Sequence, residues 1–384
     1  MTDNAKAQAF VGADIFDGAR LLNDHAVLVE NGQPAIIEPT AIPDGTATTR
    51  LEGGVLTPGF VDLQVNGGGG VMFNDSPDLP TLRIIAQAHA TLGTRAFLPT
   101  LITDTPAQTT AAIKALTAAI ADGVQGILGL HLEGPHLSVA RKGAHDPALI
   151  RPMSDADCAE LVEAAALLPN LLVTVAPESV SPAQISALTH AGVIVFLGHS
   201  DADYATACAA FAAGARGSTH LFNAMSQLTN REPGLVGATL ATPGASSGLI
   251  ADGIHVHPAT IRAALAANTG PAEVFLVTDA MACAGSDITS FTLGGRQILR
   301  ANARLTLADG TLAGADLSMA QALRVMIKEV GDPAERAFAR ATSLPADVLR
   351  DAKGAGQWPT TLDGLIYITP EFEVLCPRTM IKER

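Results

Sequence analysis

The sequence predicts an α/β protein: a (β/α)8 TIM-type barrel with a small β-sandwich domain formed by both chain ends. Three observations lead to this prediction. Apolar runs of strand length recur through the middle of the 384-residue chain, alanine-rich helical stretches usually separate them, and short strands with tight turns occupy both ends. Alternating strands and helices indicate parallel βα units. Eight such strands over roughly 290 residues suit a closed barrel.

The two chain ends share a β-rich pattern. Residues 8–57 contain short strand-like runs separated by turn pairs such as Asn31-Gly32. Residues 362–377, LDGLIYITPEFEVLCP, indicate a hairpin. Because chain ends often lie close together, we expect strands from both ends to form one small sheet. The predicted domains are a small β domain, residues 1–57 plus 355–384, and the barrel, residues 58–354.

Eight apolar runs are the candidate barrel strands. In chain order they are GFVDLQVN (59–66), AFLPTL (96–101), ILGLHLEG (127–134), LLVTVAPE (171–178), VIVFLGHS (193–200), GSTHLFN (217–223), SGLIADGIHV (247–256) and VFLVTDA (274–280). Helical patterns lie between them, with Pro, Ser or Asp near their starts and Gly at several ends. A doubly wound open sheet is the alternative, but no spaced GxGxxG leads from the first strand into a helix.

Three segments interrupt this alternation. Residues 134–153 follow the third strand and residues 224–246 follow the sixth, and we predict that both are long loops. Loops of this length in a compact domain tend to be functional. Residues 290–314 indicate β-hairpins inserted after the last barrel strand.

Composition limits the partners and the location. The net charge of −14 argues against nucleic acid, which needs a basic face, but allows a small anionic substrate held by a local arginine. The four cysteines form no CxxC pair, which suits reduced thiols in a cytoplasmic protein. We find neither a signal peptide at the N-terminus nor about 18 uninterrupted apolar residues, so we expect no membrane span.

Ionisable residues follow several of the predicted strands. The C-terminal ends of barrel strands meet at one rim, where the active site of such a barrel lies. At the ends of strands three, five and six the sequence offers Glu133, His199 and His220. Two imidazoles and a carboxylate are a familiar ligand set for a catalytic zinc ion that keeps one position for water. We predict that these three residues bind one metal ion, although each alone could be a structural residue.

Strands seven and eight add two candidate catalytic residues. Asp279 could take a proton from a metal-bound water and later pass it to a leaving group; its alternative role is a helix N-cap. His255 could donate to a developing oxyanion, or it could be a buried structural histidine. Other histidines are expected to be structural: His257 at a helix start, His131 beside the site or in the barrel core, and His25, His89 and His190 at the surface.

Seven motifs occur in order through nearly the whole barrel. They are HLEGPHL (131–137), KGAH (142–145), GHSDADY (198–204), THLFNAM (219–225), REPGL (231–235), DGIHV (252–256) and VTDA (277–280). With them the chain resembles the N-acetylglucosamine-6-phosphate deacetylases of the amidohydrolase superfamily. The resemblance implies a metal-dependent barrel that hydrolyses the acetamide of N-acetylglucosamine 6-phosphate to glucosamine 6-phosphate and acetate, in amino-sugar catabolism or cell-wall recycling.

The same resemblance assigns roles to individual residues. Asp279 activates the bound water and protonates the departing amine, and His255 polarises the acetamide carbonyl. The metal ligands are Glu133, His199 and His220. Among the substrate contacts, His145 binds sugar hydroxyls, and the phosphate is bound by the Asn223-Ala224 backbone and by Arg231. A homodimer is expected, because phosphate contacts in this family can involve a neighbouring subunit. The metal is expected to be one divalent ion per chain, Zn with Fe, Co or Mn as alternatives.

Four residues depart from patterns that are common in this family or its superfamily. His136 stands where an aromatic residue is common, and Phe222 stands where Tyr is common. We expect His136 to be a loop histidine without a special role; a further metal ligand or a substrate contact are the alternatives. Gln64 and Asn66 end the first strand, where many amidohydrolases carry a His-x-His pair that binds metal. Some deacetylases of this family have the same amides with a single metal, so we expect one ion rather than two.

Two other functions remain as alternatives. Another amidohydrolase, acting on a cyclic amide or deaminating a base, would usually need the His-x-His pair and often a bridging lysine on strand four. LLVTVAPE, the fourth run, has no lysine. A barrel that lost catalysis and serves as a non-catalytic scaffold is the second alternative, but Glu133, His199, His220 and Asp279 are all present.

Overall fold

A parallel eight-stranded sheet is the centre of the computed structural model, which describes residues 7–268, 270 and 273–380. Its strands follow chain order: β8 (Phe60–Val65), β11 (Thr94–Ile102), β12 (Leu130–Glu133), β13 (Leu171–Val175), β14 (Ile194–Leu197), β15 (Gly217–Ser218), β16 (Ser246–Leu249) and β17 (Val274–Leu276). Each strand coincides with one of the eight apolar runs, so the predicted alternation is confirmed.

The sheet closes between its first and last strands. Val65 forms a parallel bridge with Ala280, and the Asn66 N–H donates to the Ala280 carbonyl at 2.8 Å. Deeper in the barrel, the buried Asp62 carboxylate accepts hydrogen bonds from the Thr278 hydroxyl at 2.5 Å and the Thr278 N–H at 3.3 Å. This closure confirms the TIM-type barrel and argues against the open sheet.

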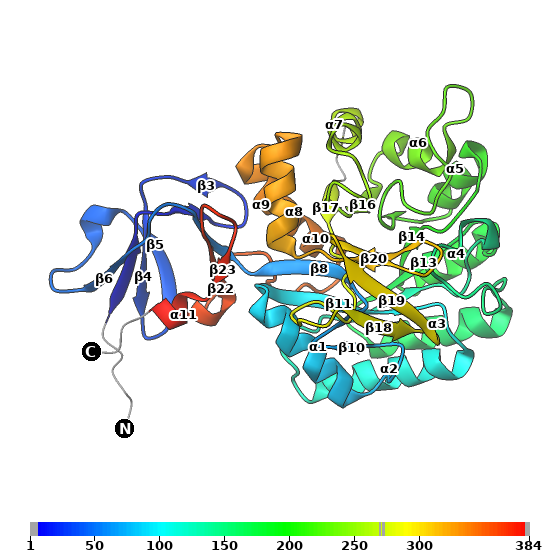
Figure 1. Ribbon diagram of the computed structural model, residues 1–384, viewed down its shortest axis with the longest axis horizontal. Coiled ribbons are helices and arrows are strands. Elements are labelled where there is room, and N and C mark those ends of the chain that lie inside the picture. The colour runs from blue at the N-terminus through cyan, green and yellow to red at the C-terminus, as the bar shows by residue number, and fades with distance from the viewer. Residues whose placement is uncertain (1–6, 269, 271–272, 381–384) are drawn as a thin grey trace.

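Helices surround the barrel (Figure 1). They are α1 (Leu79–Thr91), α2 (Pro106–Ala121), α3 (Asp155–Leu167), α4 (Pro182–His190), α5 (Tyr204–Ala212), α6 (Gly234–Ala241), α7 (Pro258–Ala267), α8 (Met319–Val325), α9 (Ala334–Ala341) and α10 (Ser343–Val348), with a π-helix at Met326–Val330. Their starts follow from their caps: Ser154 and Ser181 form capping boxes, and the Asp78 and Asp203 side chains accept from the backbone of the first turn.

The prediction that residues 224–246 form a loop is wrong over α6. The helix sequence GLVGATLA contains two glycines, which are poor helix formers, and no side chain caps its start. Burial explains the helix, since Leu235 and Val236 are fully buried in the barrel core. The 134–153 segment is irregular as expected, apart from a short 3-10 turn at Val139–Arg141.

Strands from both chain ends form the small β domain, which Figure 1 shows beside the barrel. One sheet has the order β23-β22-β7-β2-β3 and contains β2 (Asp14–Phe16), β3 (Leu21–Leu22), β7 (Val55–Pro58), β22 (Leu365–Ile368) and β23 (Val374–Leu375). The other has the order β5-β4-β1-β6, from β1 (Gln8–Val11), β4 (Ala26–Glu30), β5 (Gln33–Ile37) and β6 (Ala47–Arg50). Short helices lie at Pro39–Ala41, Leu362–Gly364 and Pro377–Met380 (α11). The pairing of β22 with β7 confirms that both ends share a sheet, whereas the boundaries after residues 57 and 354 stay a prediction.

The predicted hairpins of residues 290–314 form a second, antiparallel sheet, which we name the inserted sheet. It consists of β18 (Ser290–Leu293), β19 (Arg296–Ala301), β20 (Arg304–Thr306) and β21 (Leu312–Ala315). Figure 1 shows its strands crossing the barrel. β21 connects to the barrel through a parallel bridge between Ala315 and Ala280. A small hairpin, β9 (Gly67–Gly68) with β10 (Val71–Met72), follows strand β8.

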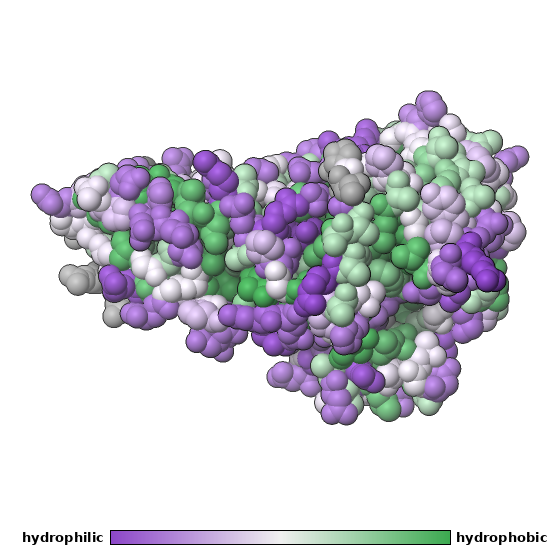
Figure 2. All heavy atoms as spheres, turned by 90° about the horizontal axis from the view of Figure 1, so that it is seen from above, coloured by the Kyte–Doolittle hydropathy of each residue, from purple (hydrophilic) through white to green (hydrophobic). Residues whose placement is uncertain are grey.

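Hydrophilic residues cover most of the protruding parts of the face in Figure 2. Of the helices in the described part of the chain, none combines the length and the apolar character that a membrane crossing requires.

Asp62 provides a test of barrel closure. Burial raises the pKa of its carboxyl group to about 7, although its hydrogen bonds to Thr278 and Gln64 oppose this shift. The folded protein therefore binds a proton there that the unfolded chain releases above its ordinary pKa near 4, and this contribution to stability is lost as the pH rises to 7. We expect about 2.5 kcal/mol less unfolding free energy from this group at pH 8 than at pH 5.

The substitution Asp62→Asn removes this titration. Its thermal unfolding midpoint should therefore fall less between pH 5 and pH 8 than that of the native protein, as measured by calorimetry. Asp44→Asn makes the same chemical change at an exposed position and should follow the native profile. Parallel profiles for all three proteins would contradict the role given to Asp62.

Candidate active site

Three ionisable side chains from separate strands converge at the C-terminal rim of the barrel. Glu133 is the last residue of β12, and His199 and His220 follow β14 and β15 by two residues. Glu133 Oε1 lies 2.9 Å from His220 Nε2 and 3.2 Å from His199 Nε2, and the two Nε2 atoms lie 3.2 Å apart. All three side chains are buried. The predicted ligand atoms are therefore close enough together to bind one ion.

The backbone turns sharply as it enters the site. His199, His220 and Asp279 have φ angles of 47°, 31° and 50°. This left-handed region is uncommon for residues other than glycine, and such strain concentrates at functional sites. Asp279 is therefore not the N-cap that was its alternative role, since the chain after it continues as a turn.

The donor set fits a divalent cation. The Nδ1–H of His199 donates to the Arg141 carbonyl at 2.8 Å, so a neutral ring points the Nε2 lone pair at the Glu133 carboxylate and at His220. Lone pairs that face one another at this distance repel unless a positive charge lies between them. Burial alone would raise the pKa of Glu133, but hydrogen bonds and charge interactions with the two imidazoles hold that pKa well below its usual value. An ionised carboxylate and two imidazoles suit zinc and similar metals.

His145 offers a competing ligand set. Ligand atoms of Glu133, His145 and His199 all lie within 4.8 Å of one another. The His145 Nδ1 atom, however, forms a 2.7 Å hydrogen bond with the Thr103 hydroxyl. Because His220 Nε2 lies 2.9 Å from Glu133 Oε1 and 3.2 Å from His199 Nε2, whereas His145 Nδ1 is hydrogen-bonded to Thr103, we favour His220 as the third ligand and His145 as a residue at the edge of the site. Burial and the neighbouring His199 lower the pKa of His145 to about 3, which keeps its ring neutral.

The two amides of the first strand hold the candidate catalytic acid. Asn66 Nδ2 donates to Asp279 Oδ1 at 2.7 Å, and Gln64 Nε2 donates to the same oxygen at 3.1 Å. Gln64 Nε2 also lies 3.3 Å from each oxygen of Glu133, so it bridges the two carboxylates. Partial burial and the nearby Glu133 raise the pKa of Asp279 to about 6. The amides therefore act as donors to carboxylates, and Asn66 Oδ1 is left without a hydrogen-bond partner.

A second carboxylate orients His255. Its Nδ1 forms a 2.6 Å contact with Asp252 Oδ2, while the other Asp252 oxygen accepts from the backbone N–H groups of Ile254 and His255. This arrangement fixes the orientation of the His255 ring and holds the loop after β16 in place. Asp252 belongs to the DGIHV motif but was assigned no role from the sequence, although its position three residues before a candidate catalytic histidine was a usable signal.

A cavity of about 380 Å³ opens above these residues. The predicted site residues that line it are Asn66, Glu133, His145, His199, His220, Asn223, Ala224, His255 and Asp279. Arg231 does not line it: this side chain is exposed on the loop before α6. The inserted sheet contributes part of the wall, which the sequence analysis did not foresee. The Arg296 guanidinium of β19 also donates to the Ala144 carbonyl and so joins this sheet to the 134–153 loop.

The remaining histidines lie outside the metal-ligand set. His131 is buried in the barrel with its Nε2 atom 2.8 Å from the Thr174 hydroxyl, and His257 caps α7, both as expected. The prediction of a surface position for His89 is wrong: the ring is buried, stacks on Phe97 and contacts the Gly67 carbonyl at 2.9 Å. Its helical position gave no sign that a glycine-rich hairpin would cover it.

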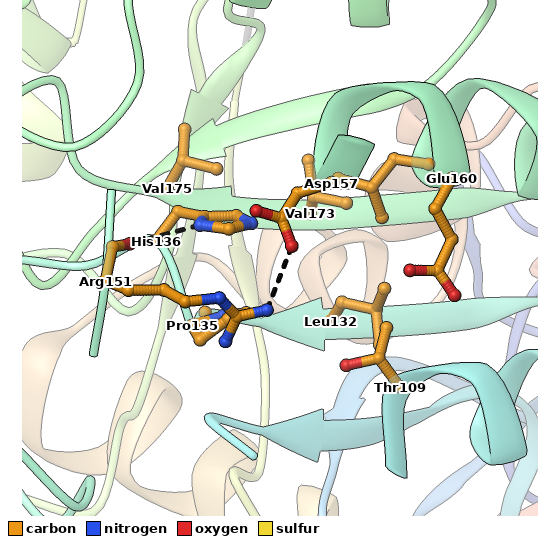
Figure 3. A pocket seen from close by; sticks show the side chains of 11 residues that line it. Thr109, Leu132, Pro135, His136, Arg151, Asp157, Glu160, Val173 and Val175 are labelled. Carbon is orange, nitrogen blue, oxygen red and sulfur yellow. Dashed lines mark hydrogen bonds and ion pairs between the residues drawn. The ribbon is translucent and has the colours of Figure 1, made fainter. Parts of the chain in front are cut away.

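His136 lies in a different, smaller cavity (Figure 3). Its Nδ1–H donates to the Arg151 carbonyl at 3.1 Å, and the Arg151 guanidinium pairs with Asp157 at 2.9 Å. The residue does not line the cavity above Glu133, which favours the interpretation of His136 as a structural loop histidine.

Comparisons with known proteins point in the same direction. The profile described as Amidohydrolase family matches residues 55–357. The N-acetylgalactosamine-6-phosphate deacetylase of Shewanella sp. (strain ANA-3) is 44% identical over 342 residues, which are 88% of this chain and 86% of that protein. The N-acetylglucosamine-6-phosphate deacetylase of Haemophilus influenzae is 34% identical over 373 residues, 96% of each chain.

Solved structures resemble the fold over nearly its full length. The N-acetylglucosamine-6-phosphate deacetylase from Pasteurella multocida superimposes with a TM-score of 0.88 at 34% identity and covers 96% of this chain and 97% of its own. A variant of the Mycobacterium smegmatis enzyme, in complex with N-acetyl-D-glucosamine-6-phosphate, gives a TM-score of 0.84 at 29% identity, with coverage of 96% and 97%.

The choice of ligands predicts the metal content. Elemental analysis of the purified protein should find about one divalent ion per chain. His220→Ala should weaken ion binding at least tenfold in a competition titration with a chromogenic chelator, because one of three ligands is lost. His145→Ala is the matched control and should keep most of the affinity. The reverse order of effects would make His145 the ligand in place of His220.

Proposed function

The chain belongs to the amidohydrolase family, and we propose that it hydrolyses the acetamide of N-acetylglucosamine 6-phosphate to glucosamine 6-phosphate and acetate. One observation carries the proposal: a three-ligand donor set and a hydrogen-bonded Asp279 line one cavity at the barrel rim. The full-length similarity to deacetylases of amino-sugar 6-phosphates supports this substrate class.

We infer that Glu133, His199 and His220 bind one divalent ion, zinc or alternatively iron, cobalt or manganese. Such an ion would supply a Lewis acid that lowers the pKa of water and polarises the acetamide carbonyl. The first strand ends in amides whose nitrogen atoms donate to carboxylates. A second ion would need ligands in their place, so the proposal is limited to a single ion.

Asp279 is the proposed proton carrier. As a carboxylate it accepts the proton of the attacking water, and as an acid it returns that proton to the departing amine nitrogen. A pKa near 6 suits both steps, since neither form is strongly disfavoured near neutral pH. Hydrogen bonds from Gln64 and Asn66 hold the carboxylate in position.

His255 is the proposed oxyanion donor. The 2.6 Å contact with Asp252 holds the ring in place, and a proton on Nε2 would be donated to the carbonyl oxygen. His255 also lines the cavity together with Asp279. His145, buried at the edge of the same cavity, is proposed to contact sugar hydroxyls.

The phosphate site is proposed to span two subunits. Asn223 and Ala224 line the cavity, and their backbone is the proposed phosphate contact. Arg231 is exposed and does not line the cavity of its own chain, so we infer that it reaches the phosphate bound by a neighbouring subunit of a homodimer. The four cysteines lie within the described residues and are free, which supports the proposal of a cytoplasmic protein.

N-Acetylgalactosamine 6-phosphate is a second candidate substrate. The Shewanella relative, named for that sugar, is 44% identical to this chain. The two sugars differ only in the configuration at C4, away from the reacting acetamide. The rates of acetate release from the two sugar phosphates, measured under the same conditions, would show which is the better substrate.

Asp279→Asn tests the mechanism. The amide cannot carry the proton, so kcat for acetate release should fall by about 10²- to 10⁴-fold while the bound metal is retained. Asp287→Asn, the same change at an exposed position, should keep native activity. Near-native turnover by the Asp279 variant would remove this residue from the mechanism.

The phosphate provides a second test. N-Acetylglucosamine 6-phosphate should be hydrolysed far faster than N-acetylglucosamine, and Arg231→Ala should raise KM for the phosphorylated sugar at least tenfold. Arg216→Ala removes an arginine that does not line the cavity and serves as the control. Equal rates for both sugars would contradict the phosphate site, and hydrolysis of neither would favour another amidohydrolase activity or a scaffold.

A further inference from the structure

Part of the cavity lining is apolar. The larger apolar side chains that line it are Ile102, Ile250, Met281, Leu293 and Leu312. Ile102, Met281 and Leu293 are buried and belong to one cluster, which also forms the core of the inserted sheet. The candidate catalytic and ligand side chains are the polar part of the lining. The cavity therefore has an apolar wall, made in part by the inserted sheet, as well as groups that act on a polar bond.

Backbone contacts hold this wall directly against Asp279. The Ala315 N–H donates to the Asp279 carbonyl at 3.1 Å. At Gly314 the backbone has a φ of 66°, and a Cβ atom there would lie 2.5 Å from Met281 Cγ and 2.8 Å from the Asp279 carbonyl oxygen. Only glycine allows this close approach, so Met281 and strand β21 lie next to the candidate proton carrier.

The chemistry of the substrate class indicates what the wall contacts. In an N-acylated hexosamine phosphate the hydroxyls and the phosphate are polar, and the alkyl part of the acyl group is the apolar substituent. That alkyl group is bonded to the carbon that is attacked, so it must lie within a few ångströms of Asp279. The remaining apolar surface, the C–H face of the sugar ring, lies further from the reacting carbon.

We propose that Met281, Leu293 and Leu312 form the acyl pocket of this site and restrict the enzyme to short N-acyl groups. The inference rests on the proposed function and adds the residues that select the acyl chain. The flexible Met281 side chain packs on Gly314 and closes the end of the pocket. The inserted sheet thereby acts as a specificity element, while the barrel provides the reaction chemistry.

The test compares acyl chain lengths. Glucosamine 6-phosphates that carry N-acetyl, N-propionyl or N-butyryl groups are assayed for release of the free amine by the metal-loaded protein. One added methylene in a tight pocket should lower kcat/KM by about 10- to 200-fold. In Met281→Ala and in Leu312→Ala the ratio of propionyl to acetyl kcat/KM should rise at least tenfold.

Ile298→Ala is the matched control, because Ile298 is buried in the same cluster but does not line the cavity. It should lose stability with an unchanged acyl ratio. Leu312→Ala, at a partly exposed position, covers the case in which Met281→Ala does not fold.

Three outcomes would overturn the acyl pocket. If all three substrates lose activity equally in Met281→Ala and Leu312→Ala, the wall contacts the sugar ring instead. If the native enzyme accepts all three acyl groups equally, the wall does not select them. If the native enzyme hydrolyses none of them, the proposed function is contradicted, and this inference with it. The first two outcomes contradict the acyl pocket alone, so the two failures are distinguishable.

Discussion

The bridge between Val65 and Ala280 joins the first and last barrel strands, and the active site is assembled at this junction. Asn66 reaches Asp279 because their strands become neighbours only when the sheet closes. One layer deeper, Asp62 binds the Thr278 hydroxyl and N–H and fixes the residue before Asp279. The catalytic geometry thus depends on a contact between segments more than 200 positions apart in the sequence.

The acidic side chains of Glu133 and Asp279 lie close together at this junction, and the groups around them shift their pKa values in opposite directions. Hydrogen bonds and charge interactions with two imidazoles lower the pKa of Glu133, whereas burial and the nearby Glu133 raise the pKa of Asp279 to about 6. Gln64 donates to both carboxylates and limits their repulsion. The amides at the end of β8 therefore position the two carboxylates by donating hydrogen bonds to them.

The barrel and its candidate ligands were predictable because both depend on local sequence: apolar runs define strands, and the residues that end them must meet at one rim. Features set by tertiary burial were not predictable. The helix α6 forms despite two glycines because the core covers it, and His89 is buried because a distant hairpin folds over α1. The cavity wall from the inserted sheet was equally hidden, since only the folded chain places Leu312 near Asp279.

The link from Arg296 to the Ala144 carbonyl joins two segments that the barrel itself does not require. Each segment is inserted after a different barrel strand, and residues of both segments line the cavity. A chimera that exchanges only the inserted sheet with that of a relative would break this link and misalign the loop that also carries Lys142 and His145. The inserted sheet and the 134–153 loop therefore form one structural unit, and they should be inherited or transplanted together.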